Sequence, residues 1–168
     1  FIRVSVQSKN ESSSLSFFFF KQKTAYEISA WLEFRRVLFR SMISIPIDEK
    51  GEPPYKSRGE VVATIYHIPS EDSTGVVYIT AGYIYEKDTI VTLRIDKNKE
   101  HEFNVIEDDS AFSDDENVDK QLIVEMKKGN KMKVIGFSSR GTKTTDSYSL
   151  AGFTTAYTYI SNLCNVKN

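Results

Sequence analysis

Two histidines, His67 and His101, are the side chains best suited to proton transfer near neutral pH. Both fall inside segments that we expect to form strands, residues 61–68 and 101–106. No zinc-protease, serine-hydrolase, P-loop or paired-cysteine motif occurs, and the spacing supplies no set of nucleophile, base and orienting group. We therefore interpret both histidines as structural or solvent-exposed, and we expect no catalytic residue, no cofactor and no metal ligand.

Carboxylates are concentrated in one loop, residues 107–119. They are Glu107, Asp108, Asp109, Asp114, Asp115, Glu116 and Asp119. The loop lacks the alternating oxygen ligands and the bidentate glutamate of a calcium loop, so a solvated charged loop is the simpler interpretation. One alternative stays open: a pocket that enclosed Asp109, Asp114 and a histidine would favour a hydrolase with a carboxylate-based site.

Cys164 and a group of tyrosines are the remaining candidates for a site. Cys164 is the only cysteine, so no internal disulfide can form and the redox compartment stays open. It is either a reactive thiol, half of a disulfide to a segment outside this chain, or, most simply, a buried thiol. Tyr78, Tyr83 and Tyr85 form either a recognition face or part of the core, and alternate strand residues share a face only if Gly82 resets the register.

The elements that must position these residues are mostly short strands. Residues 61–68, 76–81, 131–138 and 144–150 are strand-like, residues 89–95 and 101–106 predict a hairpin, and residues 140–143 predict a turn. A short helix is expected from a cap at Asn117 or Asp119 through Lys128, with Gly129 ending it. Residues 152–164 predict a final helix whose apolar stripe is Phe153, Tyr157, Ile160 and Cys164. This pattern predicts a mainly β fold, a β-sandwich with helical additions.

Residues 1–41 differ from the rest. Residues 17–41 resemble translated sequencing-adapter DNA, most clearly at 21–28 and 33–41, so we interpret residues 1–41 as a non-native leader, disordered or weakly helical, with few contacts to the rest. We expect residues 42–59 to be an irregular lead-in and residues 60–168 to form the domain. After residue 41 the chain has 15 basic and 20 acidic side chains, a balance that disfavours nucleic-acid binding. No apolar run is long enough for a transmembrane segment.

The chain from about residue 59 to 167 resembles the invasion-associated locus B family of bacterial exported proteins. The resemblance rests on Asp119-Lys120-x-Leu122, Met126-Lys127-Lys128-Gly129, Ser138-Ser139-Arg140-Gly141-Thr142, residues 144–153 and Cys164-Asn165-Val166-Lys167. Phe112 stands where many relatives have tryptophan. The motif positions carried over are Met126, Gly129, Ser139, Arg140, Gly141, Thr142, Asp146, Tyr148, Leu150, Gly152, Phe153 and Cys164. We interpret them as scaffold: Gly141 for a turn, Asp146 for local hydrogen bonds, and Gly152 with Phe153 for docking the last helix.

The resemblance implies an immunoglobulin-like β-sandwich, with a short helix before the last hairpin and a C-terminal helix. It also implies a periplasmic or secreted location, although an export signal is not found in this chain. The implied function is non-enzymatic, by binding an unknown protein or envelope partner. Two alternatives remain: an envelope hydrolase that uses the acidic loop 107–119, and a structural partner that pairs through an exposed edge strand.

Overall fold

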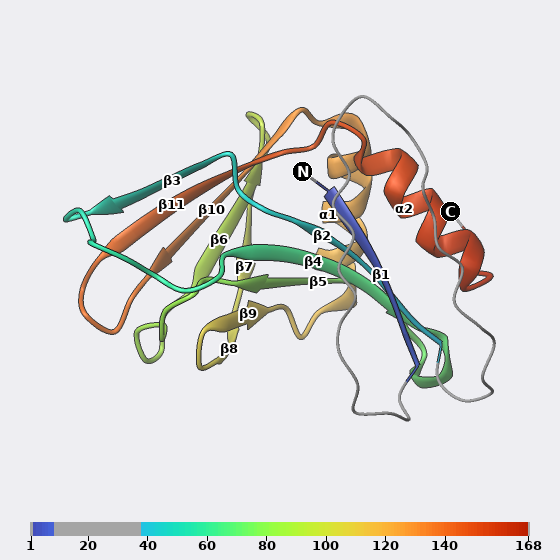
Figure 1. Cartoon of the computed structure of the whole chain (residues 1–168), viewed down its shortest axis with the longest axis horizontal. Helices are drawn as coiled ribbons and strands as arrows, with labels where there is room; N and C mark the ends of the chain where they lie inside the picture. Colours follow the sequence, from blue (N-terminus) through green and yellow to red (C-terminus); the bar gives the residue numbers. More distant parts are fainter. Residues whose placement is uncertain (1, 9–37, 168) are drawn as a thin grey trace.

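The chain folds into two antiparallel sheets packed face to face. The structure, a computed structural model, describes residues 2–8 and 38–167. The first sheet has the order β1 (Ile2–Ser8), β2 (Leu38–Ser44), β4 (Val62–Ile68), β5 (Ser73–Thr80), β9 (Ser110–Phe112) and β8 (Val105–Glu107). The second has the order β3 (Asp48–Glu52), β11 (Lys143–Ser149), β10 (Lys131–Phe137), β6 (Val91–Ile95) and β7 (Glu100–Phe103) (Figure 1).

One apolar core lies between the sheets and under two helices, α1 (Glu116–Lys128) and α2 (Phe153–Leu163). Strand alternation builds it: in β6, Val91, Leu93 and Ile95 are fully buried while the residues between them are half-buried, as a period of two requires. A one-turn helix, η1 (Pro69–Glu71), links β4 to β5. Figure 1 shows α2 at the opposite end of the molecule from β3, with α1 between them. The predicted β-sandwich, with a helix before the last hairpin and another at the C-terminus, is confirmed.

Both helices begin and end at identifiable residues. The first helical residue of α1 is Glu116, and its cap is Asp115, whose carboxylate accepts a hydrogen bond from the Asn117 backbone N–H at 2.9 Å. The expected cap at Asn117 or Asp119 is therefore wrong, because the nearest upstream carboxylate takes that role. The expected end at Lys128, before Gly129, is confirmed. In α2 all four residues of the predicted stripe, Phe153, Tyr157, Ile160 and Cys164, are buried.

The structure differs from the sequence-based expectation in the first sixty residues. Residues 42–59 were expected to be irregular, yet β2 reaches Ser44 and β3 covers 48–52. Residues 2–8 and 38–41 are strand and not helix: β1 pairs with β2 along its whole length, and β2 pairs with β4. Residues 2–8 alternate apolar and polar residues, which is a strand pattern, but the segment is too short for the pattern to have predicted a strand. The other residues of the leader, including Phe34, lie outside the described residues, and its non-native origin stays a prediction.

The start of the acidic loop is also more ordered than expected. The strand expected at 101–106 is split into β7 and β8, and β8 turns back into β9 at residues 108 and 109. Asp108 takes a positive φ of 52° in this turn, a conformation that aspartate tolerates better than most residues. The hairpin adds two short strands to the first sheet and fixes the position of Asp109.

The predicted turn between β10 and β11 is confirmed, and Gly141 adopts a positive φ of 79° there. A side chain at this position would meet no atom within 4 Å, so a substitution should cost only backbone strain. We expect Gly141→Val to lower the free energy of unfolding by about 1–3 kcal/mol, measured by urea denaturation.

Gly141→Asn is the matched control, because asparagine enters the left-handed region more readily than valine. The asparagine variant should lose clearly less stability than the valine variant. Equal losses would show that strain at this φ is not the cause.

Candidate functional site

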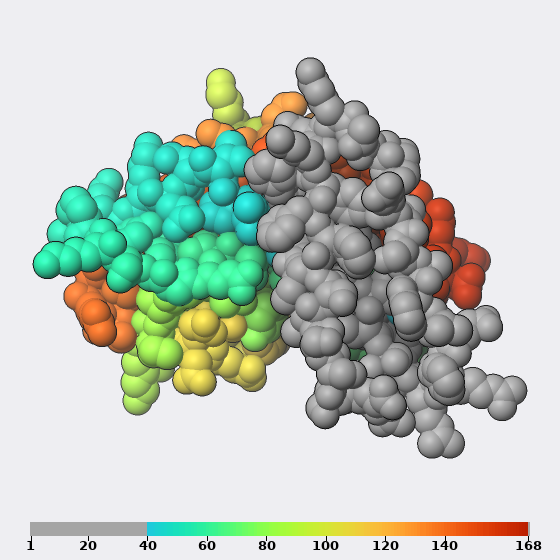
Figure 2. All heavy atoms as spheres, in the orientation of Figure 1, coloured from blue at the N-terminus to red at the C-terminus, as the bar shows by residue number. Residues whose placement is uncertain are grey.

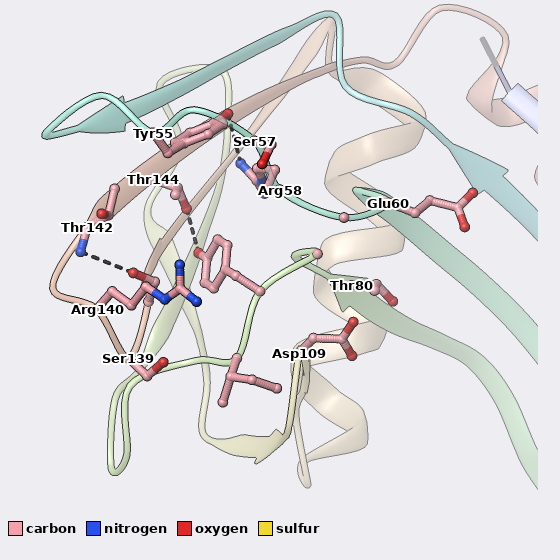
Figure 3. Close-up of a pocket in the computed structure, with 15 residues that line it drawn as sticks. Tyr55, Ser57, Arg58, Glu60, Thr80, Asp109, Ser139, Arg140, Thr142 and Thr144 are labelled. Carbon is pink, nitrogen blue, oxygen red and sulfur yellow. Dashed lines mark hydrogen bonds between the residues drawn. The ribbon is translucent and has the colours of Figure 1, made fainter.

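A groove of about 740 Å³, lined by charged, hydroxyl and aromatic residues, opens at the end of the molecule away from α2. Three segments line it: residues 55–60 between β3 and β4, the chain that follows β5 at residues 80–84 together with Asp109, and the β10–β11 turn from 138 to 144 (Figure 3). In Figure 2 the cyan-to-green, yellow and orange atoms of these segments lie in the left half of the molecule. The groove therefore unites parts of the chain that are far apart in sequence.

The β10–β11 turn presents Arg140 from a rigid backbone. Gly141 N–H donates to the Ser138 carbonyl at 2.8 Å, and Ser138 N–H donates to the Thr142 carbonyl at 2.9 Å. Thr142 N–H donates to the Ser138 hydroxyl at 3.1 Å. The Arg140 guanidinium is exposed and has no partner among the residues that the structure describes. It is thus a cation held at the rim and available to a ligand.

The opposite wall is the segment 81–85, which joins the two sheets. Ala81 N–H donates to the Asp109 carbonyl at 2.8 Å, and Tyr85 N–H donates to the Asp108 carbonyl at 2.9 Å. On the other side, Ser139 N–H donates to the Ile84 carbonyl at 2.9 Å. One carboxylate oxygen of Asp109 accepts from the Ser110 hydroxyl at 3.0 Å. The segment thereby holds Asp109 and Arg140 in fixed relative positions on the two sides of the groove (Figure 3).

The third wall depends on a close approach of two backbones. Gly59 N–H donates to the Gly82 carbonyl at 2.7 Å. A Cβ on Gly82 would stand 2.6 Å from the Gly59 carbonyl carbon, so a larger residue there would force the chains apart. Gly82 also has a positive φ of 69°, so the chain leaves the strand conformation after β5, as expected.

The base of the groove is a buried ion pair between Arg58 and Asp146. The guanidinium donates from Nη1 to Oδ1 and from Nη2 to Oδ2 of the carboxylate, both at 2.8 Å. The two side chains are only 5% and 3% exposed. Burial opposes the charge of Arg58, but the hydrogen bonds to Asp146 and Tyr55 outweigh it, so the pKa of Arg58 lies above its usual value. Arg58 therefore stays charged, and its guanidinium is already paired with Asp146.

Arg58 also orders the aromatic side chains around it. Its Nε donates to the Ala81 carbonyl at 2.8 Å, which ties the first sheet to Asp146 in the second. Its guanidinium lies 5.4 Å from the ring centre of Tyr55 and 5.1 Å from that of Tyr83, within the range of cation–π attraction. The Tyr83 and Thr144 hydroxyls are hydrogen-bonded at 2.6 Å. The base of the groove is thus a preorganised polar and aromatic surface.

The histidines lie away from this groove. His67 is fully buried between β4 and α2; its Nδ1 accepts the Gly75 N–H at 2.9 Å, so Nε2 carries the proton and donates to the Ser161 hydroxyl at 3.1 Å. Burial lowers the pKa of His67 to about 4, so it is neutral at pH 7. His101 is buried and contacts Glu125 of α1, with Nε2 and Oε1 3.1 Å apart. Both make the structural contacts expected of them.

The carboxylates of the acidic loop separate into different environments. Asp109 lines the groove, whereas Asp114 accepts a hydrogen bond from Asn104 at 3.0 Å on the surface. Asp119 is buried on the inner face of α1 and accepts the Val77 N–H at 3.2 Å. Burial raises the pKa of Asp119 to about 7. The structure therefore does not bring Asp109, Asp114 and a histidine together.

The twelve motif residues fall into two groups. Ser139, Arg140 and Thr142 line the groove, Gly141 is at its rim, and Asp146 anchors Arg58 beneath it. The assignment of Asp146 to local hydrogen bonds is wrong, because its partner is 88 residues away. The second group is buried with α1 and α2 or lies at their ends: Met126, Gly129, Tyr148, Leu150, Gly152, Phe153 and Cys164. Within that group the Tyr148 hydroxyl is buried without a hydrogen-bond partner.

The tyrosines do not share one face. Tyr83 and Tyr85 meet edge to face, with ring centres 5.2 Å apart, and only Tyr83 of this pair lines the groove. Tyr78 instead stacks on Phe112 at 5.6 Å across the β5–β9 pair. Sequence reasoning missed Tyr55 and Arg58 altogether. The only available signal was their position after Pro53-Pro54, which indicates an ordered but non-helical segment.

No three histidine, cysteine, aspartate or glutamate side chains gather in residues 2–8 and 38–167 where they could hold a metal ion. Neither α1 nor α2, nor any other helix in this part of the chain, is long and apolar enough to cross a membrane.

Comparison with known protein families identifies a match over most of the chain. A family model described as "Invasion associated locus B (IalB) protein" matches residues 47–161. The match begins before the expected start near residue 59, so it includes β3 and the Arg58 segment. No curated protein and no solved structure matches the chain.

Proposed function

The chain belongs to the invasion-associated locus B family, and from that premise we propose that it is a non-enzymatic domain of the bacterial envelope that binds a partner in the groove described above. The groove would take the part of the partner that is recognised. The family membership supports the domain type and an envelope association. A periplasmic or secreted location is part of the proposal.

The observation that carries this proposal is the set of unused polar groups around a rigid base. Arg140, Glu60 and the second carboxylate oxygen of Asp109 have no partner among the described residues, yet each belongs to a wall fixed by backbone hydrogen bonds. The backbone of each wall is thus preorganised, so ordering on ligand binding is limited to the side chains. A volume of about 740 Å³ lies within the usual range for ligand sites.

The same geometry favours binding over hydrolysis. A carboxylate-based hydrolase needs a second acid or base within reach of the first. Both histidines, His67 and His101, are engaged with Ser161 and Glu125 in other parts of the fold, and Glu60, the other carboxylate that lines the groove, is exposed. Besides Asp109, the charged residues that line the groove are Glu60, Arg58 and Arg140, and mixed charges of this kind support recognition of a polar ligand.

A site-specific crosslinking experiment tests the proposal. A photoreactive amino acid replaces Ile84, which lines the groove and is 54% exposed. The purified full chain is mixed with a bacterial envelope extract and irradiated. We expect adducts of defined mass. They should be absent when the same protein also carries Arg140→Ala, since the guanidinium would hold the partner in place.

Val124 provides the matched control position. It is 52% exposed but lies on α1, away from the groove. The same photoreactive residue at 124 should give no defined adduct. Identical adducts at both positions, or none at 84, would overturn the proposal.

A further inference from the structure

We propose that the groove recognises a short peptide segment carrying a carboxylate and an amine, with Arg140 binding the carboxylate and Asp109 binding the amine. This inference rests on the proposed function and names the class of ligand for the same site. It follows from the separation of charge across the groove and from the hydroxyl groups between the charges.

The positive side of the groove consists of Arg140 alone. The other arginine, Arg58, is neutralised by Asp146 at 2.8 Å and lies at the base. Arg140 is free, and a guanidinium can bind a carboxylate through two parallel hydrogen bonds. The Ser139 side chain, from the same turn, also lines the groove and adds a hydroxyl that can donate to the same anion.

The negative side consists of Asp109 and Glu60. Asp109 is half-buried and Glu60 is exposed, and they come from separate segments that both reach the groove. Figure 3 places both across the groove from Arg140. Two carboxylates with free oxygens attract an ammonium group and repel an anion. A ligand with negative charge alone would therefore meet repulsion on this side, and one with positive charge alone would meet it at Arg140.

The surface between the charges suits a peptide backbone. Thr80 and Thr142 line it with partly exposed side chains, and Ile84 and the rings of Tyr55 and Tyr83 line it as well. Hydroxyls both donate and accept hydrogen bonds, which matches the alternating N–H and C=O groups of an extended chain.

Defined peptides test this ligand class. The probes are N-acetylated, C-amidated peptides with one aspartate and one lysine separated by none, one or two glycines, in both orders. Binding to the full chain is measured by calorimetry and by changes in amide resonances. We expect at least one spacing to bind and to shift resonances of the 138–144 turn and of Asp109. Replacing its aspartate with asparagine, or acetylating its lysine, should weaken binding about tenfold or more.

Matched protein variants assign each contact. Arg140→Gln should weaken binding of the aspartate peptide about tenfold and leave binding of its asparagine analogue unchanged. Asp109→Asn should weaken binding of the lysine peptide about tenfold and leave binding of its acetyl-lysine analogue unchanged. Lys128→Gln and Glu102→Gln remove exposed charges outside the groove and should change nothing. Equal effects of Arg140→Gln on both peptides, or no binding at any spacing, would overturn the inference.

The two experiments fail independently. Specific crosslinking at position 84 without peptide binding would keep the proposed function and refute the ligand class. If an N-acetylglucosamine oligomer bound in place of the peptides, a neutral sugar would be the ligand and the dipolar assignment would be wrong. Loss of both crosslinking and peptide binding would refute both proposals.

Discussion

Replacing Arg58 with methionine is expected to cost about 3–5 kcal/mol of the free energy of unfolding. Methionine keeps much of the aliphatic volume but leaves Asp146, which is 3% exposed, as a buried charge without a partner. It also removes the hydrogen bond from Nε to the Ala81 carbonyl, so the two sheets lose a direct connection at the groove. Urea denaturation followed by circular dichroism measures the effect.

Two comparisons separate the buried charge from a general loss of packing. Replacing both partners, in Arg58→Met with Asp146→Leu, should recover much of the stability, because no unpaired charge remains. Lys120→Met removes an exposed ion pair with Glu116, whose N and O atoms are 2.8 Å apart, and should cost less than about 1 kcal/mol. If the double variant were as unstable as Arg58→Met, the buried charge would not be the cause.

The pH dependence of Arg58→Met provides a further check. Burial already raises the pKa of Asp146 above its usual value despite the opposing effect of Arg58; loss of Arg58 should raise it further, so the folded state binds the proton more tightly than in the unsubstituted chain. Stability should then rise as pH falls through that raised pKa towards the unfolded value of about 3.9. The deficit of Arg58→Met against the unsubstituted chain is therefore expected to shrink in acid. A deficit that is constant with pH would contradict this.

The features that could be predicted from the sequence depend on local patterns. The stripe of α2 repeats every three or four residues, and the β10–β11 turn has a glycine where positive φ is needed; each signal lies within a dozen residues. The family motif likewise led to Arg140 and Asp146. Its residues are adjacent in sequence, so the resemblance located the turn that forms one wall of the groove.

The rest of the groove depends on contacts between distant segments. Arg58 meets Asp146 across 88 residues, and Gly59 meets Gly82 through backbone atoms alone. Neither contact leaves a periodic pattern, so residues 55–60 resembled an irregular lead-in. The hairpin that holds Asp109 was missed because its strands have only three residues each and carry the acidic residues typical of a loop.

Phe153→Ala is expected to lower the free energy of unfolding by about 3–5 kcal/mol, because loss of the large aromatic ring leaves a cavity in the core. Phe153 is 3% exposed and stacks on Tyr157, with ring centres 5.9 Å apart. Its backbone N–H donates to the Leu150 carbonyl at 3.0 Å, and Gly152 turns the chain into α2 with a φ of 85°. The tightly connected backbone at the start of α2 limits how far it can move to fill the cavity.

Thr155→Ala is the control on the exposed side of α2 and should change the free energy of unfolding by less than about 0.5 kcal/mol. Phe153→Leu should fall between the two, since leucine refills part of the cavity. Because Phe153 lies outside the groove, Phe153→Leu should also keep the crosslink formed from position 84. Equal stability losses at 153 and 155 would show that the apolar stripe of α2 does not anchor the helix to the sandwich, and loss of the crosslink in a folded Phe153→Leu variant would show that α2 contributes to partner binding.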